Sequence, residues 1–272
     1  MKRNCKWLCA LAVLSAMTFA GCAAAPSAGE VADGGVTEGE ESILPDAPLN
    51  PPEDLPENEQ PQINYVTYIK MTADGVNIRS GAGANYKSLG YAEKNTLYSV
   101  SDTVGNWYKT YYKGMEAYIY KDFCLLVEFE AASDKVEKVI EEGTKHMGVK
   151  YVYGATRYHN GKGVLLSGFS AQAFDCSSLM QYMFKKGADV NLQVTTRTQV
   201  VQGKTVTDGL RRGDLMFFTN ASRKNNTGVE RIGHVALYLG NNYILHTASD
   251  YAKIEQISST RWSYYIQSQR MI

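Results

Sequence analysis

The side chains best suited to covalent chemistry are one cysteine and two histidines in the second half of the chain. Cys176 lies in the run from Ala173 to Ser178, and His234 and His246 follow it with a spacing of twelve residues. A thiol becomes a strong nucleophile when an imidazole takes its proton and a further polar group orients that imidazole. These residue types predict a nucleophilic Cys176, with His234 as its base and His246 as the orienting group.

Cys176 is expected at the start of a helix. Asp175 precedes an apolar face that runs from Leu179 to Phe184 and stops at Gly187, which predicts Asp175 as the N-cap. The helix dipole and the free backbone N–H groups at such a start stabilise a thiolate and lower its pKa. The same N–H groups can bind the oxyanion of a tetrahedral intermediate.

The two histidines are expected on one β-hairpin. Short alternating strands are predicted at residues 234–239 and 243–248, joined by a Gly-Asn-Asn loop. A three-residue loop makes Ala236 the partner of His246 and places His234 diagonally from His246 on the same face. A two-residue loop would place them on opposite faces. The alternative is that both histidines are ordinary polar positions of a half-exposed sheet.

The remaining cysteine and histidines of the mature chain are expected to be structural. Cys124 lies in the apolar run 123–127, which predicts a buried strand and a hydrophobic role for the thiol. His146 falls in the last turn of an amphipathic helix predicted within 133–148 and is expected to be solvated. His159 lies in a Gly-rich loop. Neither histidine has metal-ligand spacing, and no metal site is predicted.

The first part of the chain has the pattern of a secreted protein. Three basic residues precede an apolar run at 7–20, and small residues then lead to Cys22, as in a signal peptide. The run is shorter than the about 20 residues that a membrane-spanning helix needs. Two further cysteines leave with the signal, so Cys124 and Cys176 allow one disulfide but do not imply it.

Two regions of opposite charge follow the signal. Residues 23–64 contain ten acidic residues, all seven prolines and no Lys or Arg, a composition that predicts an extended tether. Residues 65–272 contain 25 basic and 18 acidic residues, a net charge of +7, without a Lys/Arg cluster. We therefore expect no nucleic acid partner, and an anionic polymer of the cell envelope is favoured.

Residues 65 to about 128 predict a small all-β barrel, because β-branched and aromatic runs alternate there with turn residues. The predicted strands are 65–71, 75–79, 97–100, 107–112 and 117–120. The runs 75–81, 106–109 and 114–120 resemble the bacterial SH3-like module of cell-wall enzymes. Members of that family bind wall peptides or abut a catalytic domain, and both roles remain open here.

Two further resemblances cover the ends of the chain. The residues before Cys22 resemble the lipobox of bacterial lipoproteins, although Phe19 replaces the usual leucine; this implies acylation of Cys22 and an extracytoplasmic protein anchored by lipid to the bacterial cell membrane. The runs Tyr151–Gly154, Asp175–Ser177 and Gly213–Phe218, followed by the two histidines, resemble in their order the NlpC/P60 family. The implied domains are a signal peptide at 1–21, a tether at 22–64, an SH3-like domain at 65–129 and an NlpC/P60 domain at 132–272.

The NlpC/P60 resemblance implies an α+β, papain-like fold and a Cys-His-His triad. It implies hydrolysis of the bond between γ-D-glutamate and the diamino acid of peptidoglycan stem peptides, with no cofactor, and we expect a monomer. The substrate contacts that it implies are Tyr151, Asp175, Ser177 and Thr196. In relatives, the residue matching Asp175 pairs with a free amine on the terminal L-alanine of the substrate; helix capping alone is the alternative.

One departure from the family pattern concerns Tyr151. The family places this tyrosine about a dozen residues before the cysteine, whereas Tyr151 precedes Cys176 by 25 residues. An inserted loop at 155–172 is implied, and its glycines suit a mobile wall or cover of the cleft. Two other functions stay open: a catalytically silent wall-binding lipoprotein, and a papain-like amidase or acyltransferase.

Overall fold

The computed structural model describes residues 63–272, which belong to one compact unit of the chain. The predicted signal peptide, Cys22 and the tether up to residue 62 lie outside the described residues. Within 63–272, no helix has the length and apolar character needed to cross a membrane.

The first elements form an all-β module, as predicted. Together with the helices and strands that follow, they give the expected α+β class. Its strands are β1 (Tyr65–Met71), β2 (Val76–Arg79), β3 (Ser88–Ala92), β4 (Leu97–Ser99), β5 (Asp102–Val104), β6 (Trp107–Tyr112), β7 (Met115–Tyr120) and β8 (Cys124–Glu130), with a 3-10 turn η1 (Lys121–Phe123) before β8. One sheet has the order β3-β2-β7-β6-β5, while β4, β1 and β8 join a larger sheet. The prediction missed β3 and β5; every residue of β5 is exposed, which leaves no alternation to detect.

The prediction of a buried strand around Cys124 is wrong. Strand β8 lies at the edge of its sheet, where Leu125 is 59% and Leu126 57% exposed. Cys124 itself is half-buried, and its thiol lies 3.4 Å from the carbonyl oxygen of Tyr120. Cys124 and Cys176 are both free, so the disulfide that they would allow is absent from the described part of the chain.

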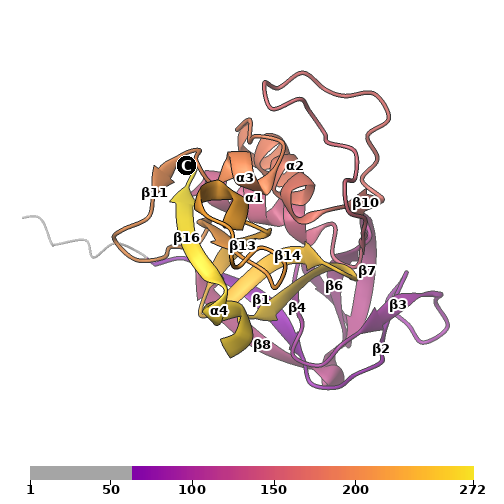
Figure 1. Cartoon of the computed structure of the whole chain (residues 1–272). Helices are drawn as coiled ribbons and strands as arrows, with labels where there is room; N and C mark the ends of the chain where they lie inside the picture. Colours follow the sequence, from indigo (N-terminus) through magenta and orange to yellow (C-terminus); the bar gives the residue numbers. More distant parts are fainter. Residues whose placement is uncertain (1–62) are drawn as a thin grey trace, which may run out of the picture. The chain divides into compact units, whose positions relative to one another are not determined.

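The second half combines helices with strands of the larger sheet. Its elements are α1 (Asp134–Thr144), β9 (Lys150–Tyr151), β10 (Ala173–Phe174), α2 (Cys176–Ala188), α3 (Thr196–Gln199), β11 (Lys204–Thr205), β12 (Leu215–Phe218), η2 (Gly228–Arg231), β13 (His234–Gly240), β14 (Tyr243–Ala248), β15 (Tyr251–Gln256), α4 (Ser259–Ser263) and β16 (Tyr265–Arg270). The sheet order is β11-β16-β12-β13-β14-β15-β4-β1-β8. Helices α1 and α2 lie side by side, and α2 packs on β13 and β14 (Figure 1).

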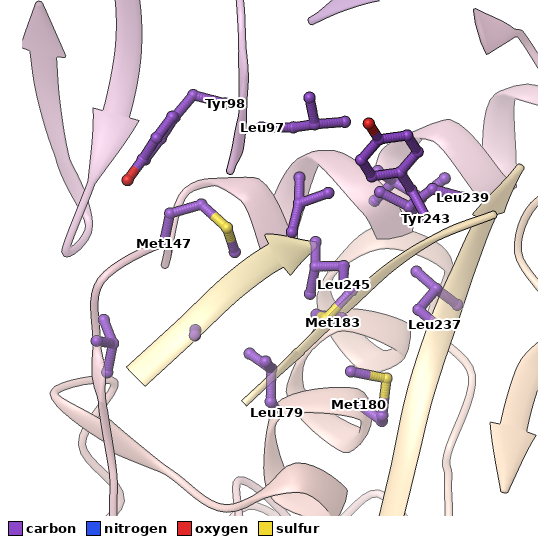
Figure 2. Close-up of a cluster of buried hydrophobic side chains, with 14 of the residues drawn as sticks. Leu97, Tyr98, Met147, Leu179, Met180, Met183, Leu237, Leu239, Tyr243 and Leu245 are labelled. Atoms are coloured by element: carbon purple, nitrogen blue, oxygen red, sulfur yellow. The ribbon is translucent and has the colours of Figure 1, made fainter. Parts of the chain in front are cut away.

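The packing of α2 on the hairpin places the start of the helix, which carries Cys176, next to the start of β13, which carries His234. Figure 2 shows Leu179, Met180 and Met183 of α2 beside Leu237 and Leu245 of the hairpin, in the buried core. All five side chains are fully buried, and each contributes roughly 1.5–3 kcal/mol of hydrophobic free energy. This core fixes the start of α2 against the start of β13.

The hairpin reaches its predicted register by a different route. Its loop has two residues, because Gly240 faces Tyr243, and such a loop alone would separate the two histidines. A β-bulge between Tyr238 and Gly240 adds one residue to β13. Leu237 therefore faces Leu245, the alignment expected from a three-residue loop, and both histidines lie on one face.

The all-β module is joined directly to the second half. Ile254 of β15 aligns with Leu97 of β4, which makes the larger sheet continuous across the two halves. The buried guanidinium of Arg212 donates to both carboxylate oxygens of Glu137 at 2.7 and 2.8 Å, and to the Tyr68 hydroxyl at 2.9 Å. Of the two roles left open for the SH3-like module, abutting the second domain is thus observed.

Candidate active site

Cys176 is the first residue of α2, as predicted. Asp175 is the N-cap: its carboxylate accepts from the backbone N–H of Ser178 at 2.8 Å, and the Ser178 hydroxyl bonds the Asp175 N–H in return. The Cys176 side chain is 7% exposed, and the backbone N–H groups of Ser177 and Val235 lie close enough to its sulfur to favour the thiolate. Since Val235 directly follows His234, this contact ties the thiol to the start of β13.

The two histidines form one chain of hydrogen bonds that ends on a carboxylate. His234 Nε2 lies 3.0 Å from His246 Nδ1, and His246 Nε2 lies 3.0 Å from Glu255 Oε1. Arg261 Nη2 donates to the same oxygen at 3.1 Å. Burial raises the pKa of Glu255, but His246, Arg261 and Lys253 outweigh it and lower that pKa to about 2.

The ionised Glu255 determines which nitrogens of His246 and His234 carry a hydrogen. Since Glu255 only accepts, His246 Nε2 carries the hydrogen that lies between them. The other nitrogen of a neutral His246 is then an acceptor, so His234 Nε2 donates to it. His234 Nδ1 is left with a lone pair, which is what a general base for the thiol requires.

Burial controls the protonation of the three reactive groups. Burial, followed by the charge of Asp175, raises the pKa of Cys176 to about 11, although the N–H groups of Val235 and Ser177 and the charge of Arg157 act in the opposite direction. The prediction that the helix start lowers the pKa of this thiol is therefore wrong, because the loss of solvation outweighs the stabilisation of the thiolate by the helix start. Burial also lowers the pKa of His246 and, together with His246 and Arg261, lowers that of His234 well below its usual value.

Two adjoining hollows open at these groups. The Cys176 hollow, of about 390 Å³, contains Cys176, and the His234 hollow, of about 420 Å³, contains His234. Tyr151, Asn220 and Gly233 line both hollows. An extended chain lying through the two would thus pass the thiol and the imidazole, an arrangement suited to a peptide.

The four predicted substrate contacts all line the Cys176 hollow: Tyr151, Asp175, Ser177 and Thr196. Tyr151 reaches it despite its distance in sequence, because β9 and β10 pair in parallel and align Tyr151 with Phe174. Burial, followed by the nearby Cys176 and Asp175, raises the pKa of Tyr151 to about 12, so its hydroxyl keeps its proton. Such a hydroxyl can donate to an oxyanion.

The segment 155–172 forms the long loop between β9 and β10 (Figure 1). Its two ends rest on α2, where the rings of Tyr158 and Phe169 lie 5.2 and 5.5 Å from the ring of Tyr182. Only its first part reaches the active site, because Arg157 lines the Cys176 hollow. The loop thus supplies part of a wall of the hollow.

The other two histidines are buried. His146 is 7% exposed and packs edge-on against Phe174 and Tyr182, so the prediction that it is solvated is wrong. The helix ends at Thr144, and the chain then turns inward towards the core. His159 is also buried, beside Gln181. Among residues 63–272, no group of three or more His, Cys, Asp or Glu residues is placed to hold a metal ion.

Sequence reasoning missed Glu255, Arg261 and Arg157. A signal for Glu255 exists: β15 pairs with β14, His246 faces Lys253, and Glu255 lies two residues beyond on the same side. The contacts of Arg157 depend on the path of a long loop, and those of Arg261 depend on the short helix α4. Neither segment has a periodic sequence pattern.

Comparison with known proteins agrees with the sequence pattern. Residues 148–271 match the model of the NlpC/P60 family, and residues 74–123 match that of the bacterial SH3 domain. The peptidoglycan endopeptidase RipA of Mycolicibacterium smegmatis is 31% identical over 137 residues, which make up 49% of this chain and 25% of that protein. The gamma-DL-glutamyl hydrolase of Bacillus subtilis is 29% identical over 126 residues, 46% of this chain and 26% of that protein.

The matched region spans about a quarter of the length of these two relatives. A solved NlpC/P60 family protein from Bacillus cereus aligns with 76% of this chain and 63% of its own, at 18% identity and a TM-score of 0.41. The two family matches lie in chain order on the all-β module and on the part that carries Cys176, His234 and His246. The chain therefore carries a bacterial SH3 domain followed by an NlpC/P60 domain.

Proposed function

We propose that the protein is a cysteine endopeptidase that cleaves the bond between γ-D-glutamate and the diamino acid in peptidoglycan stem peptides. The observation that carries the proposal is the hydrogen-bonded chain of His234, His246 and Glu255, whose first member lines a hollow that adjoins the hollow of a cysteine at a helix start. The relatives named above are a peptidoglycan endopeptidase and a gamma-DL-glutamyl hydrolase, which supports this choice of substrate. Arg197 and Arg223, which line the Cys176 hollow and pair with the exposed Glu230, suit a carboxylate of such a stem.

The residues suit a two-step acyl transfer. His234 Nδ1 takes the thiol proton as the Cys176 sulfur bonds to the carbonyl carbon, and backbone N–H groups at the start of α2 bind the oxyanion. When the C–N bond breaks, the imidazolium returns the proton to the leaving amine. Water then attacks the thioester and gives a proton to His234, and this step releases the acid and restores the thiol.

The test is digestion of purified sacculi followed by mass spectrometry of the soluble products. We expect stem fragments cut after γ-D-glutamate, and no such fragments with Cys176→Ala. Fragments formed equally well by Cys176→Ala would remove the cysteine from the mechanism. Retained muropeptide binding without any cleavage would favour a silent wall-binding protein, and other product masses would identify an amidase or acyltransferase.

We further propose that Cys22 is acylated and holds the protein on the outer face of a bacterial membrane. The support is its position directly after the apolar signal and the small residues Ala20 and Gly21. Cys22→Ala should move the protein from the membrane fraction to the soluble extracytoplasmic fraction. An unchanged distribution on cell fractionation would remove the lipid anchor.

A further inference from the structure

Donor groups of the protein itself occupy all acceptor positions of the Asp175 carboxylate. Oδ1 accepts from the Ser178 N–H at 2.8 Å and from the Ser177 hydroxyl at 3.1 Å. Oδ2 accepts from Arg157 Nη1 at 2.9 Å and from the Gly154 N–H at 3.1 Å. A carboxylate has about four acceptor positions, so Asp175 has none left for another donor.

Arg157 is held firmly in this position. Its Nε donates to the carbonyl oxygen of Val194 and its Nη1 to that of Ala155, both at 2.6 Å, while its Nη2 donates to the Ser177 hydroxyl at 3.2 Å. The side chain is only 17% exposed. Displacing this guanidinium would leave several buried acceptors unpaired, which is costly.

The charge of the Cys176 hollow follows from these contacts. Asp175 is the one acidic side chain in its lining, and Arg157 neutralises it. Arg197 and Arg223 line the same hollow, and both pair with one carboxylate outside the lining, that of the exposed Glu230, at 3.4 and 3.3 Å. An ammonium group entering beside Asp175 would meet a guanidinium of like charge and no free carboxylate of the lining.

We propose that Arg157 determines substrate choice by excluding a free amine, so that the enzyme acts on stems whose L-alanine nitrogen is acylated, as in stems still joined to the glycan. The inference rests on the proposed function, since it specifies which form of the stem peptide enters that site. An amide nitrogen is uncharged and needs no carboxylate, so it can lie beside the Asp175–Arg157 pair. Arg157 belongs to the inserted segment 155–172, which gives that segment a role in specificity.

The experiment compares two stem tetrapeptides that differ only in the N-terminus, one with a free amine and one acetylated. We expect kcat/KM to be at least about tenfold higher for the acetylated peptide. Arg157→Gln frees the charge of Asp175 and should reduce this ratio by about tenfold or more, mainly through a lower KM for the free amine. Arg197→Gln, in the same hollow but without a contact to Asp175, should change both peptides alike.

Binding of both peptides to Cys176→Ala protein, measured by calorimetry, separates this inference from the proposed function. Tighter binding of the acetylated peptide supports the role of Arg157 even when the wild-type protein cleaves neither peptide, a result that would overturn the proposed function alone. Equal binding, or tighter binding of the free amine, overturns the role of Arg157. If Arg157→Gln fails to fold, equal wild-type rates on the two peptides would still overturn the proposal.

Discussion

The proton positions at the active site depend on Glu255, a residue that no catalytic motif indicated. Glu255→Gln keeps the size of the side chain but allows its amide to donate to His246 Nε2. His246 would then carry its hydrogen on Nδ1 and donate it to His234 Nε2, so the hydrogen of His234 would lie on Nδ1. This removes the lone pair that the proposed mechanism uses to accept the thiol proton. A carboxylate-to-amide change behind a catalytic histidine acts in this way elsewhere.

We therefore expect Glu255→Gln to lower kcat by roughly a hundredfold with little change in KM, because Glu255 does not line either hollow. Steady-state kinetics on the stem peptide measure both constants. The matched control is Glu116→Gln, which loses a surface ion pair with Lys109 in the SH3 domain and should leave kcat unchanged. A Glu255→Gln enzyme with full kcat would show that the histidines keep their tautomers without the carboxylate.

The state of the resting thiol follows from the competition between burial and the helix start. Because burial raises the pKa of Cys176 to about 11, the thiol form predominates at neutral pH. The rate of iodoacetamide alkylation should then rise about tenfold for each pH unit between 7 and 9, because only the thiolate reacts. A Cys124→Ser background limits the reaction to Cys176 within residues 63–272. A rate independent of pH over this range would indicate a preformed thiolate–imidazolium pair.

At the scale of elements, the bulge in β13 decides whether the two histidines meet. Gly240 has a φ of +96°, which a residue with a Cβ adopts only with strain. Gly240→Ala should lower the free energy of unfolding by about 1–3 kcal/mol and reduce kcat where the protein is still folded. Urea denaturation and kinetics measure the two effects. Asn241→Gly, in the same turn with a φ of +48°, should leave both nearly unchanged.

This hairpin also shows how far the sequence predicts the structure. Alternation identified both strands, and the capping pattern placed Cys176 at the first residue of α2, because these signals are local. The bulge was missed because a Gly-Asn-Asn loop is compatible with two or three loop residues. The roles of Arg157 and Glu255 were missed because they arise from contacts across 18 and nine residues of sequence, which no local pattern records.

At the scale of the whole molecule, the titratable histidines are concentrated in one half of the described chain. All four histidines of the sequence lie after residue 145, and burial lowers the pKa of each. In the unfolded chain these imidazoles have a pKa near 6.5, so the unfolded state binds more protons as the pH falls below that value. The sheet joins the two domains through β15 and β4, so this loss of stability should affect both.

The free energy of unfolding should therefore be nearly constant above pH 6.5 and fall steadily between pH 6.5 and 4.5. His146 contributes strongly, because burial lowers its pKa to about 4, a difference worth on the order of 3 kcal/mol at full effect. The carboxylate of Glu255, with a pKa of about 2 when folded, loses its contribution only below its unfolded value near pH 4.5, which leaves the upper window to the histidines. Urea denaturation at several pH values measures the slope, and His146→Gln should flatten it, whereas Lys135→Gln on the exposed face of α1 should not. An equally steep slope in the His146→Gln protein would mean that this imidazole is already charged in the fold.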